Sequence, residues 1–406
     1  MISSATATVD RNQGIPERDG ADMREAAAEG LAIVTDLCLF LCGDVMLGRG
    51  LDQIMPHPSQ PRLHEAHADS AVTYVRLAEE TSGHRLPRQV APTYIWGDAL
   101  AVLHAAKPAA RIINLETAVT TSTQYWPKGI NYRMHPDNIG CLTAAQIDCC
   151  VLANNHVLDW GQAGLLDTLA TLRRTDICSA GAGRDAAEAA APAMLPLPGG
   201  ARVLVYGFAT TTSGVPRDWA AGADKPGINL LPDLSVVTAA RLAEVAMAER
   251  HAGDLLIASV HWGGNWGYDI THAQRAFAHA LVDGGFDLLH GHSSHHAKGI
   301  EVYRQKLLLY GCGDFINDYE GISGYEDFRG DLTVMYLPRL DSTSGHLLSL
   351  EMVPMQIRDF RLNRPSSQDV QWLHQALARE CAKLDTDVAL RADGSFAIEN
   401  RGHKRG

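Results

Sequence analysis

The sequence predicts an α/β fold, because short apolar runs typical of buried strands alternate with segments of helical period. Continuous apolar runs such as residues 37–42 and 255–260 are what strands buried on both faces look like. Between residues 331 and 360 two strand-like segments follow one another without a helix between them. This arrangement predicts an antiparallel layer joined to the βαβ part of the chain.

The expected elements occur throughout the chain. Strands are expected at residues 37–42, 111–115, 149–152, 202–208, 255–260, 286–289 and 307–310, and helices at residues 68–80, 96–106, 161–174, 273–283 and 367–383. We expect residues 1–30 to form a flexible arm, residues 31–390 a single domain, and residues 391–406 a polar tail. Residues of about 52–93 are rich in proline and histidine and indicate an insertion over one face.

The composition limits the classes of partner. The 406-residue chain has 35 Lys and Arg against 47 Asp and Glu, a net charge of -12, so neither nucleic acid nor an anionic membrane is an expected partner. The eight cysteines form no Cys-x-x-Cys pair, which is typical of reduced thiols. Charged residues interrupt the first thirty positions, and no later apolar run is long enough to span a bilayer. A cytoplasmic protein is therefore expected.

Four histidines fall within seven residues at positions 290, 292, 295 and 296, directly after an apolar run. We expect Gly291 to turn the chain sharply at the end of this strand, so that His292, His295 and His296 line a crevice above the sheet while His290 points into the fold. A polar loop with solvated histidines is the simpler alternative. Four imidazoles after one buried strand favour metal ligation or proton transfer.

Polar residues also follow four other strands: Asp44, Glu116, the Asn155-His156 pair and His261. Because the carboxyl ends of parallel strands meet at one edge of a sheet, these side chains are expected near the same crevice. Taken alone, Asp44 is equally well explained as a turn residue capping the next segment. The amide and imidazole cluster around Asn155 needs polar partners, and a bound ion or substrate supplies them.

These strand ends carry a recognisable set of motifs, namely GDVMLGR (43–49), NLETAVT (114–120), ANNHVLDWG (153–161), HWGGNW (261–266), Gly291-His292 followed by His295, and YGCGDFIND (310–318). The set resembles the capsule-synthesis CapA/PgsA family of the calcineurin-like metallophosphatase superfamily over roughly residues 35–320. The resemblance implies a four-layer αββα sandwich of the metallophosphatase type with long loop insertions. It also implies one or two divalent ions, with Mn, Ca, Zn and Fe as candidates.

The resemblance further implies roles for single residues. Asp44 would bind a first ion and Glu116 would bridge. Asn155, His261 and His292 would bind a second ion, while His295 would approach the first ion and His156 would face the substrate.

Two departures from the superfamily pattern weaken the first ion site. Met46 stands where the superfamily has a histidine, and Ser293-Ser294 removes another imidazole. Ordinary two-metal phosphoester hydrolysis needs both ions, so the departures argue against it.

Three functions compete. The sequence is similar to the intracellular peptide epimerases of lasso-peptide biosynthesis, and its main expected function is metal-dependent inversion of the Cα of the C-terminal tryptophan of a ribosomal precursor peptide. His295 and His156 would then be the catalytic acid and base. Substrate contacts are expected from Arg49, Trp126, Trp262 and Trp266, although any single tryptophan is as easily a core residue. The alternatives are a metallophosphoesterase or an amide hydrolase of the poly-γ-glutamate type, and a binding protein with a decayed site.

The loops at 120–138 and 210–233 and the insertion at 52–93 carry several aromatic residues. Because long irregular loops often act as lids or substrate loops, we expect them to form the substrate groove.

Overall fold

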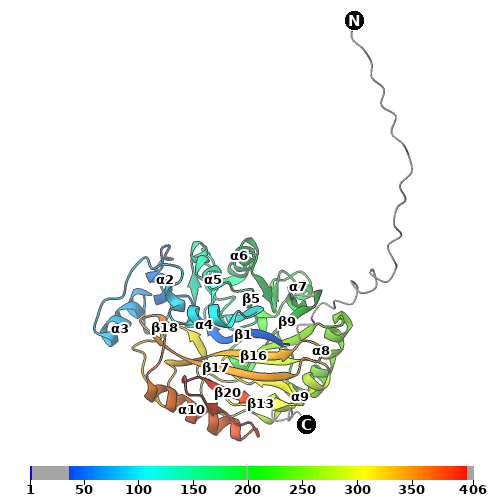
Figure 1. Ribbon diagram of the computed structural model, residues 1–406. Helices are drawn as coiled ribbons and strands as arrows, with labels where there is room; N and C mark the ends of the chain where they lie inside the picture. The colour runs from blue at the N-terminus through cyan, green and yellow to red at the C-terminus, as the bar shows by residue number, and fades with distance from the viewer. Residues whose placement is uncertain (2–35, 198–199, 400–406) are drawn as a thin grey trace, which may run out of the picture. The chain divides into compact units, whose positions relative to one another are not determined.

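The computed structural model describes residue 1 and residues 36–197 and 200–399 (Figure 1). Except for Met1, the predicted arm at residues 1–30 therefore lies outside the described residues. One compact unit begins at Thr35 and contains every helix and strand of the described chain.

A ten-stranded mixed sheet forms one half of this unit, with the order β19-β20-β17-β16-β1-β2-β5-β6, while β15 pairs with β1 and β18 with β17. The strands β1, β2, β5 and β6 are parallel, and β16 and β17 form the antiparallel pair expected between 331 and 360. Their bounds are β1 (Asp36–Val45), β2 (Ala110–Leu115), β5 (Cys149–Val151), β6 (Cys178–Ala180), β15 (Asp314–Ile316), β16 (Leu332–Asp341), β17 (Leu347–Arg358), β18 (Arg361–Asn363), β19 (Ala389–Leu390) and β20 (Phe396–Glu399).

A six-stranded sheet forms the other half, with the order β13-β14-β12-β11-β9-β8. Its central strands β14, β12, β11 and β9 are parallel. The bounds are β8 (Ala193–Pro196), β9 (Arg202–Ala209), β11 (Leu255–His261), β12 (Leu288–His292), β13 (Ile300–Tyr303) and β14 (Lys306–Leu309). Two small ribbons pair β3 (Ala118–Val119) with β4 (Arg133–Met134), and β7 (Ala182–Gly183) with β10 (Gly227–Ile228).

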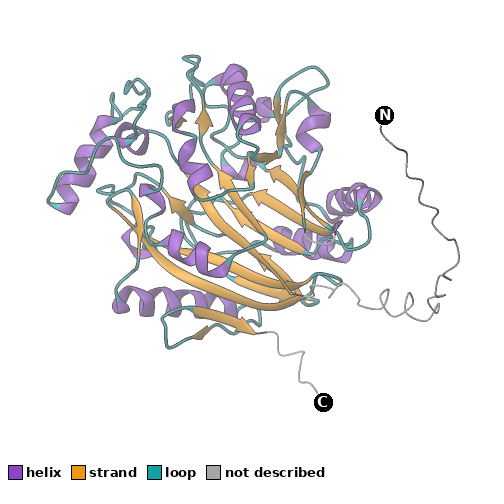
Figure 2. Ribbon diagram, turned by 45° about the horizontal axis from the view of Figure 1, so that its top comes forward, coloured by secondary structure: helices purple, strands orange, loops and turns teal. Residues whose placement is uncertain are grey.

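Helices flank the strands (Figure 2). The α-helices are α2 (Gly50–Ile54), α3 (Val72–Ser82), α4 (Ala99–Ala106), α5 (Gly140–Ala144), α6 (Gly161–Arg174), α7 (Ala186–Ala190), α8 (Val236–Glu249), α9 (His272–Asp283) and α10 (Ser367–Ala382), and the short 3-10 helices are η1 (Tyr94–Trp96), η2 (Pro136–Asn138), η4 (Thr211–Ser213), η5 (Arg217–Trp219) and η6 (Glu326–Phe328). Each strand and helix named from the sequence is present; the ends of α6 are those predicted, and each of the others is shifted at one end or both.

The core follows from the alternation of side chains along each strand. In β1, Leu39 and Leu41 pack into a cluster shared with the six-stranded sheet, while Phe40 and Cys42 pack into a cluster shared with α3, α4, α5 and α6. A third cluster joins the six-stranded sheet to α8 and α9. Strands with apolar neighbours on both faces explain the continuous apolar runs of the sequence.

The prediction of a polar tail from residue 391 is wrong for its middle part. Phe396 and Ile398 are buried in strand β20, which pairs antiparallel with β17 at Met352↔Phe396. Because the strand has only four residues, its apolar alternation is too short to separate it from a loop by period. Residues 400–406 lie outside the described chain.

The predicted turn at Gly291 is also wrong. Gly291 lies inside β12, and the chain turns at Ser293, whose φ is 99°. A Cβ at Gly291 would lie 2.6 Å from the carbonyl oxygens of both Leu309 and Tyr310. The glycine is therefore required by the close approach of the neighbouring backbone.

All eight cysteines are free thiols, and all but the half-buried Cys178 are buried, as expected. Among the described residues, no helix has both the length and the apolar character needed to cross a membrane.

Candidate metal centre

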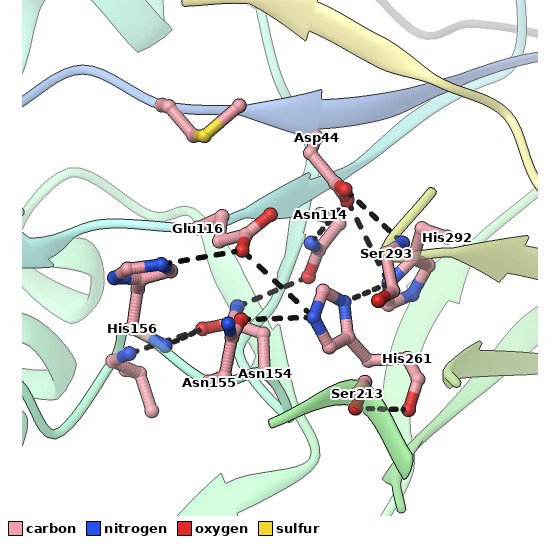
Figure 3. A network of polar contacts seen from close by, with 12 residues as sticks. Asp44, Asn114, Glu116, Asn154, Asn155, His156, Ser213, His261, His292 and Ser293 are labelled. Carbon is pink, nitrogen blue, oxygen red and sulfur yellow. Dashed lines mark hydrogen bonds and ion pairs between the residues drawn. The ribbon is translucent and has the colours of Figure 1, made fainter. Parts of the chain in front are cut away.

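Three ligand-type side chains from different strand ends meet in the interior of the unit. Asp44 comes from β1, His261 from β11 and His292 from β12, and one ligand atom of each lies within 4.8 Å of the others. Parallel pairing of β11 and β12 puts His261 opposite His292, and their Nδ1 atoms lie 2.8 Å apart (Figure 3). All three side chains are fully buried. The sequence expectation that these strand ends converge is met.

Glu116 and Asn155 lie against the same group. The Oε1 atom of Glu116 is 3.8 Å from His261 Nε2, and the Oδ1 atom of Asn155 is 2.9 Å from the same nitrogen. Among the described residues, the buried Oε2 atom of Glu116 makes no hydrogen bond of standard geometry, and the Glu116 carboxyl group interacts with the like-charged carboxyl group of Asp44. An unpartnered buried carboxylate oxygen is costly, and a cation would satisfy it.

The charge balance of the group also fits a cation. Burial raises the pKa of Asp44 to about 7, and the carboxylate of Asp314 adds to this effect. Burial, followed by the charge of Asp44, raises the pKa of Glu116 well above its usual range. Burial lowers the pKa values of His261 and His292, so both imidazoles are neutral, as metal ligation requires.

The donor chemistry narrows the choice of ion. The five residues offer two imidazoles together with carboxylate and amide oxygens, a set that suits Zn, Mn or Fe. Calcium takes oxygen ligands almost exclusively, so the two imidazoles disfavour it. The residues therefore fit a divalent ion.

His156 is held by a buried carboxylate beside this group. Its Nδ1 atom lies 2.6 Å from Asp159 Oδ2, and its Nε2 atom lies 3.7 Å from Glu116 Oε1. Asp159 also accepts a hydrogen bond of 2.7 Å from the backbone N–H of Tyr132 and forms an ion pair of 2.8 Å with Lys128. Burial lowers the pKa of His156 to about 4, although Asp159 opposes this shift.

His295 is held by a second buried carboxylate. Its Nδ1 atom lies 2.8 Å from Asp314 Oδ1, and Asn317 donates a hydrogen bond of 2.8 Å to the other oxygen of Asp314. Strand β15 pairs with β1 at Asp44↔Asp314, which puts Asp314 beside Asp44 and hence beside the group of possible metal ligands. Burial opposes protonation of His295, but the charge and hydrogen bond of Asp314, together with the charge of Asp44, outweigh it and raise the pKa above its usual value.

Sequence reasoning missed both of these carboxylates. Asp159 lies three residues after His156, so one turn brings the two side chains together, and this spacing was the available signal. Asp314 lies in a strand of only three residues, and nothing in its neighbours indicates a pairing with His295, nineteen positions earlier.

The other two histidines of the 290–296 stretch do not belong to the ligand group, although the ring of His290 lies 5.2 Å from that of His292. His290 Nε2 is 2.7 Å from the carbonyl of Cys42, so it points into the fold as predicted. His296 packs against the rings of Trp266 and Phe328 instead of lining the crevice, and its predicted place there is wrong. Its ring fills a gap between aromatic side chains.

Trp262 is a core residue, and its predicted contact with substrate is wrong. Its indole donates a hydrogen bond of 2.9 Å to the carbonyl of Tyr310, and it packs with Phe277 of α9. Because successive strand residues face opposite sides, a residue that follows the inward-facing His261 turns toward the helices.

The remaining predicted substrate residues lie in different surroundings. Trp126 packs edge-on against Trp219 at 5.8 Å, and the ring of Trp266 lies 5.2 Å from that of His295. Arg49 is buried, with its guanidinium 2.6 Å from Asp318 and 3.4 Å from Glu65. A substrate would have to displace these carboxylates to reach the guanidinium. In the structure Arg49 therefore forms ion pairs within the protein, whereas the sequence predicted a contact with substrate.

Known proteins are similar in sequence to this chain over most of its length. A family model described as "Bacterial capsule synthesis protein PGA_cap" matches residues 38–319. A probable polyglutamine synthesis accessory protein of Mycobacterium tuberculosis is 46% identical over 362 residues, which cover 89% of this chain and 95% of the relative.

More distant relatives are the PGA biosynthesis protein CapA of Bacillus subtilis and the capsule biosynthesis protein CapA of Bacillus anthracis. Both are 26% identical; the first match covers 78% of this chain and 70% of the relative, and the second covers 57% and 53%. With a family model that matches well over half of its length, the chain belongs to the PGA_cap family of bacterial capsule synthesis proteins.

Proposed function

We propose that this protein is a metal-dependent acid–base enzyme that acts on an amide-linked glutamate polymer, the hydrolase alternative drawn from the sequence. The observation that carries the proposal is the pair of His–Asp hydrogen bonds, one beside Glu116 and the other beside Asp44. The polyglutamine and PGA synthesis named for the relatives supports this substrate class. No relative named here is described as an epimerase.

Asp44, His261 and His292 would hold the ion, with Glu116 and Asn155 completing its surroundings. When bound, a divalent ion polarises a carbonyl oxygen and lowers the barrier to attack on an amide. The buried position of the ligands excludes bulk water, which strengthens every charge interaction at the substrate.

The two histidines supply the proton transfers. In each pair the aspartate fixes Nδ1, so Nε2 is the atom left to take or give a proton. In amide hydrolysis one imidazole takes the proton of the attacking water, and the other gives a proton to the departing nitrogen. Both side chains are about a tenth exposed, so they reach the edge of the site while the ligands stay buried.

Peptide epimerisation is the second candidate, and one observation favours it. The structure provides two hydrogen-bonded histidines but, with Met46 at the position of the superfamily's histidine, a depleted first ion site. Inverting a Cα needs one group that removes a proton and another that returns one from the other side, and it needs no leaving-group stabilisation. A ribosomal precursor peptide as partner, and a cytoplasmic location, remain predictions under this reading.

The finer architecture is part of the proposal. A four-layer αββα sandwich of the metallophosphatase type is supported by the three core clusters, which lie between the two sheets and between each sheet and its helices. Such an arrangement would put the ligands at the strand ends of both inner sheets.

One experiment separates the candidates. Manganese-loaded protein is incubated in D2O with poly-γ-glutamate and, separately, with a peptide that ends in tryptophan, and mass spectrometry follows cleavage and deuterium uptake. Shortened glutamate chains support the hydrolase, whereas a gain of one mass unit per peptide without cleavage supports the epimerase. A double variant, His156→Asn with His295→Asn, is the control, and activity that persists in it would refute the acid–base role.

A further inference from the structure

The loop at residues 121–130 is tied to the metal centre through a small number of side chains. None of these ten residues, all described, is buried, and none belongs to a helix or strand. Tyr125 stacks on His64 in the first half of the loop, and Ser122 bonds to the backbone of Trp160. In the second half, Trp126 packs against the core and Lys128 reaches the residues of the metal centre.

Lys128 connects three parts of the centre. Its Nζ atom donates a hydrogen bond to the backbone carbonyl of Asn155, lies 3.2 Å from His156 Nδ1, and forms an ion pair of 2.8 Å with Asp159 Oδ1. Only 16% of the lysine side chain is exposed, and the Asp159 side chain is fully buried. The ammonium ion donates to two acceptors, the Asn155 carbonyl and the Asp159 carboxylate, while His156 Nδ1 donates to Asp159 and only lies near the ammonium.

Asp159 is the other half of this connection. Besides holding His156, it accepts a hydrogen bond of 2.7 Å at its backbone carbonyl from the N–H of Trp126, and Asn131 donates to the same carbonyl at 3.3 Å. The loop is therefore hydrogen-bonded to Asp159, the residue that holds the imidazole of His156. Lys128 also lies 5.2 Å above the ring of Trp219, which belongs to the 210–233 loop.

We propose that Lys128 is a positioning residue through which the 121–130 loop and the metal centre are thermodynamically coupled. The hydrogen bond from Lys128 to the backbone carbonyl of Asn155 holds this residue in place, and the Oδ1 atom of its side chain lies next to His261. The ion pair between Lys128 and Asp159 holds Asp159, to which the loop is hydrogen-bonded. An ion that draws in Asn155 therefore orders the loop, and an ordered loop tightens ion binding by the same factor, because coupling between two sites is reciprocal. The inference rests on the metal site of the proposed function.

The experiment measures both directions of the coupling on metal-free full-length protein titrated with Mn²⁺. Hydrogen–deuterium exchange follows the amides of residues 121–131, and calorimetry gives the Mn²⁺ dissociation constant. In the wild type, Mn²⁺ is expected to slow exchange in this segment. In Lys128→Met, the slowing should be lost and the dissociation constant should rise roughly tenfold, a typical size for coupling between sites.

Two further variants separate positioning from general damage. Lys128→Arg keeps a cation of sufficient reach and should restore at least part of the coupling. Lys225→Met is the matched control, because Lys225 Nζ bonds to the carbonyl of Asp218 in the other loop, and it should behave as wild type.

The outcomes distinguish this inference from the proposed function. If wild-type protein does not bind Mn²⁺, the metal site itself is wrong, and the coupling fails with it. If it binds Mn²⁺ while exchange at 121–131 is unchanged, or if Lys128→Met binds as tightly as wild type, the metal site stands and the coupling is refuted.

Discussion

The candidate site contains two pairs in which a histidine is hydrogen-bonded to a buried aspartate, and the two pairs come from different parts of the fold. We call them the His156 side and the His295 side. His156 and Asp159 are three residues apart in the turn after β5, whereas His295 and Asp314 come from segments nineteen residues apart that meet through the pairing of β15 with β1. The His156 side has a lysine beside its aspartate, and the His295 side has an asparagine.

The surroundings shift the pKa values of the two imidazoles in opposite directions. Burial lowers the pKa of His156 to about 4, with the charge of Lys128 acting in the same sense. Burial also disfavours the charged form of His295, but Asp314 and Asp44 outweigh it and raise its pKa. Two titratable groups pushed apart in this way are typical of sites that need one acid and one base.

The largest expected effect concerns His261, which lies between the two sides. His261→Ala removes the residue that contacts Asn155, Glu116 and His292, so bound divalent metal should fall to background in elemental analysis. Glu116→Gln should do the same. His296→Asn is the control, because His296 lies outside the cluster, and full metal content in His261→Ala would disprove the ligand set.

The next effect compares the two histidines directly. His156→Asn and His295→Asn keep polarity but lose basicity, so each should reduce turnover by roughly a hundredfold or more, as expected for loss of a general acid or base. Metal content should remain. If metal is lost in proportion to activity, His295 is a plain ligand, and if only one variant loses activity, the two-sided account is wrong.

A smaller effect distinguishes the aspartates. Asp159→Asn disturbs the bonds to His156, Tyr132 and Lys128 together, so it should lower stability by about 1 to 3 kcal/mol in addition to reducing activity. Asp314→Asn should reduce activity with less loss of stability, because the 121–130 loop does not depend on it. Denaturant unfolding of both variants tests this order, and equal losses would remove the difference between the sides.

The last effect is on the pH dependence of stability and concerns Glu320, next to Tyr319, whose ring lies against His295. Burial raises the pKa of Glu320 from 4.5 to about 7, so the folded state binds more protons than the unfolded state between these values. Stability should therefore fall as pH rises from about 4.5 to 7, by at most about 3 kcal/mol for this group. Glu320→Gln should flatten that decline in thermal unfolding curves, and an unchanged curve would show that Glu320 does not contribute.

The strand ends were predictable from the sequence because a buried strand and the polar residue after it are adjacent in the chain. Asp44, Glu116, Asn155, His261 and His292 were all named in this way, and the structure brings them together. Parallel strands deliver their carboxyl ends to one edge, so local patterns suffice for the ligand group.

What the sequence could not show depends on pairing between distant segments. Asp314 reaches His295 only because β15 lies beside β1, and no local period reports that contact. Trp262 was assigned to the substrate although it follows an inward-facing histidine, a case where strand alternation decides the side. Strand β20 needed its partner β17 to be recognised.

Diffraction from crystals grown with Mn²⁺, with anomalous differences measured near the manganese edge, tests the central claim most directly. The account predicts an anomalous peak bound by Asp44, His261 and His292, with Glu116 and Asn155 beside it, and with the Nε2 atoms of His156 and His295 not bound to it. An empty cluster would contradict the account. So would a manganese peak ligated elsewhere, for instance by the buried Glu301 and its neighbour His279.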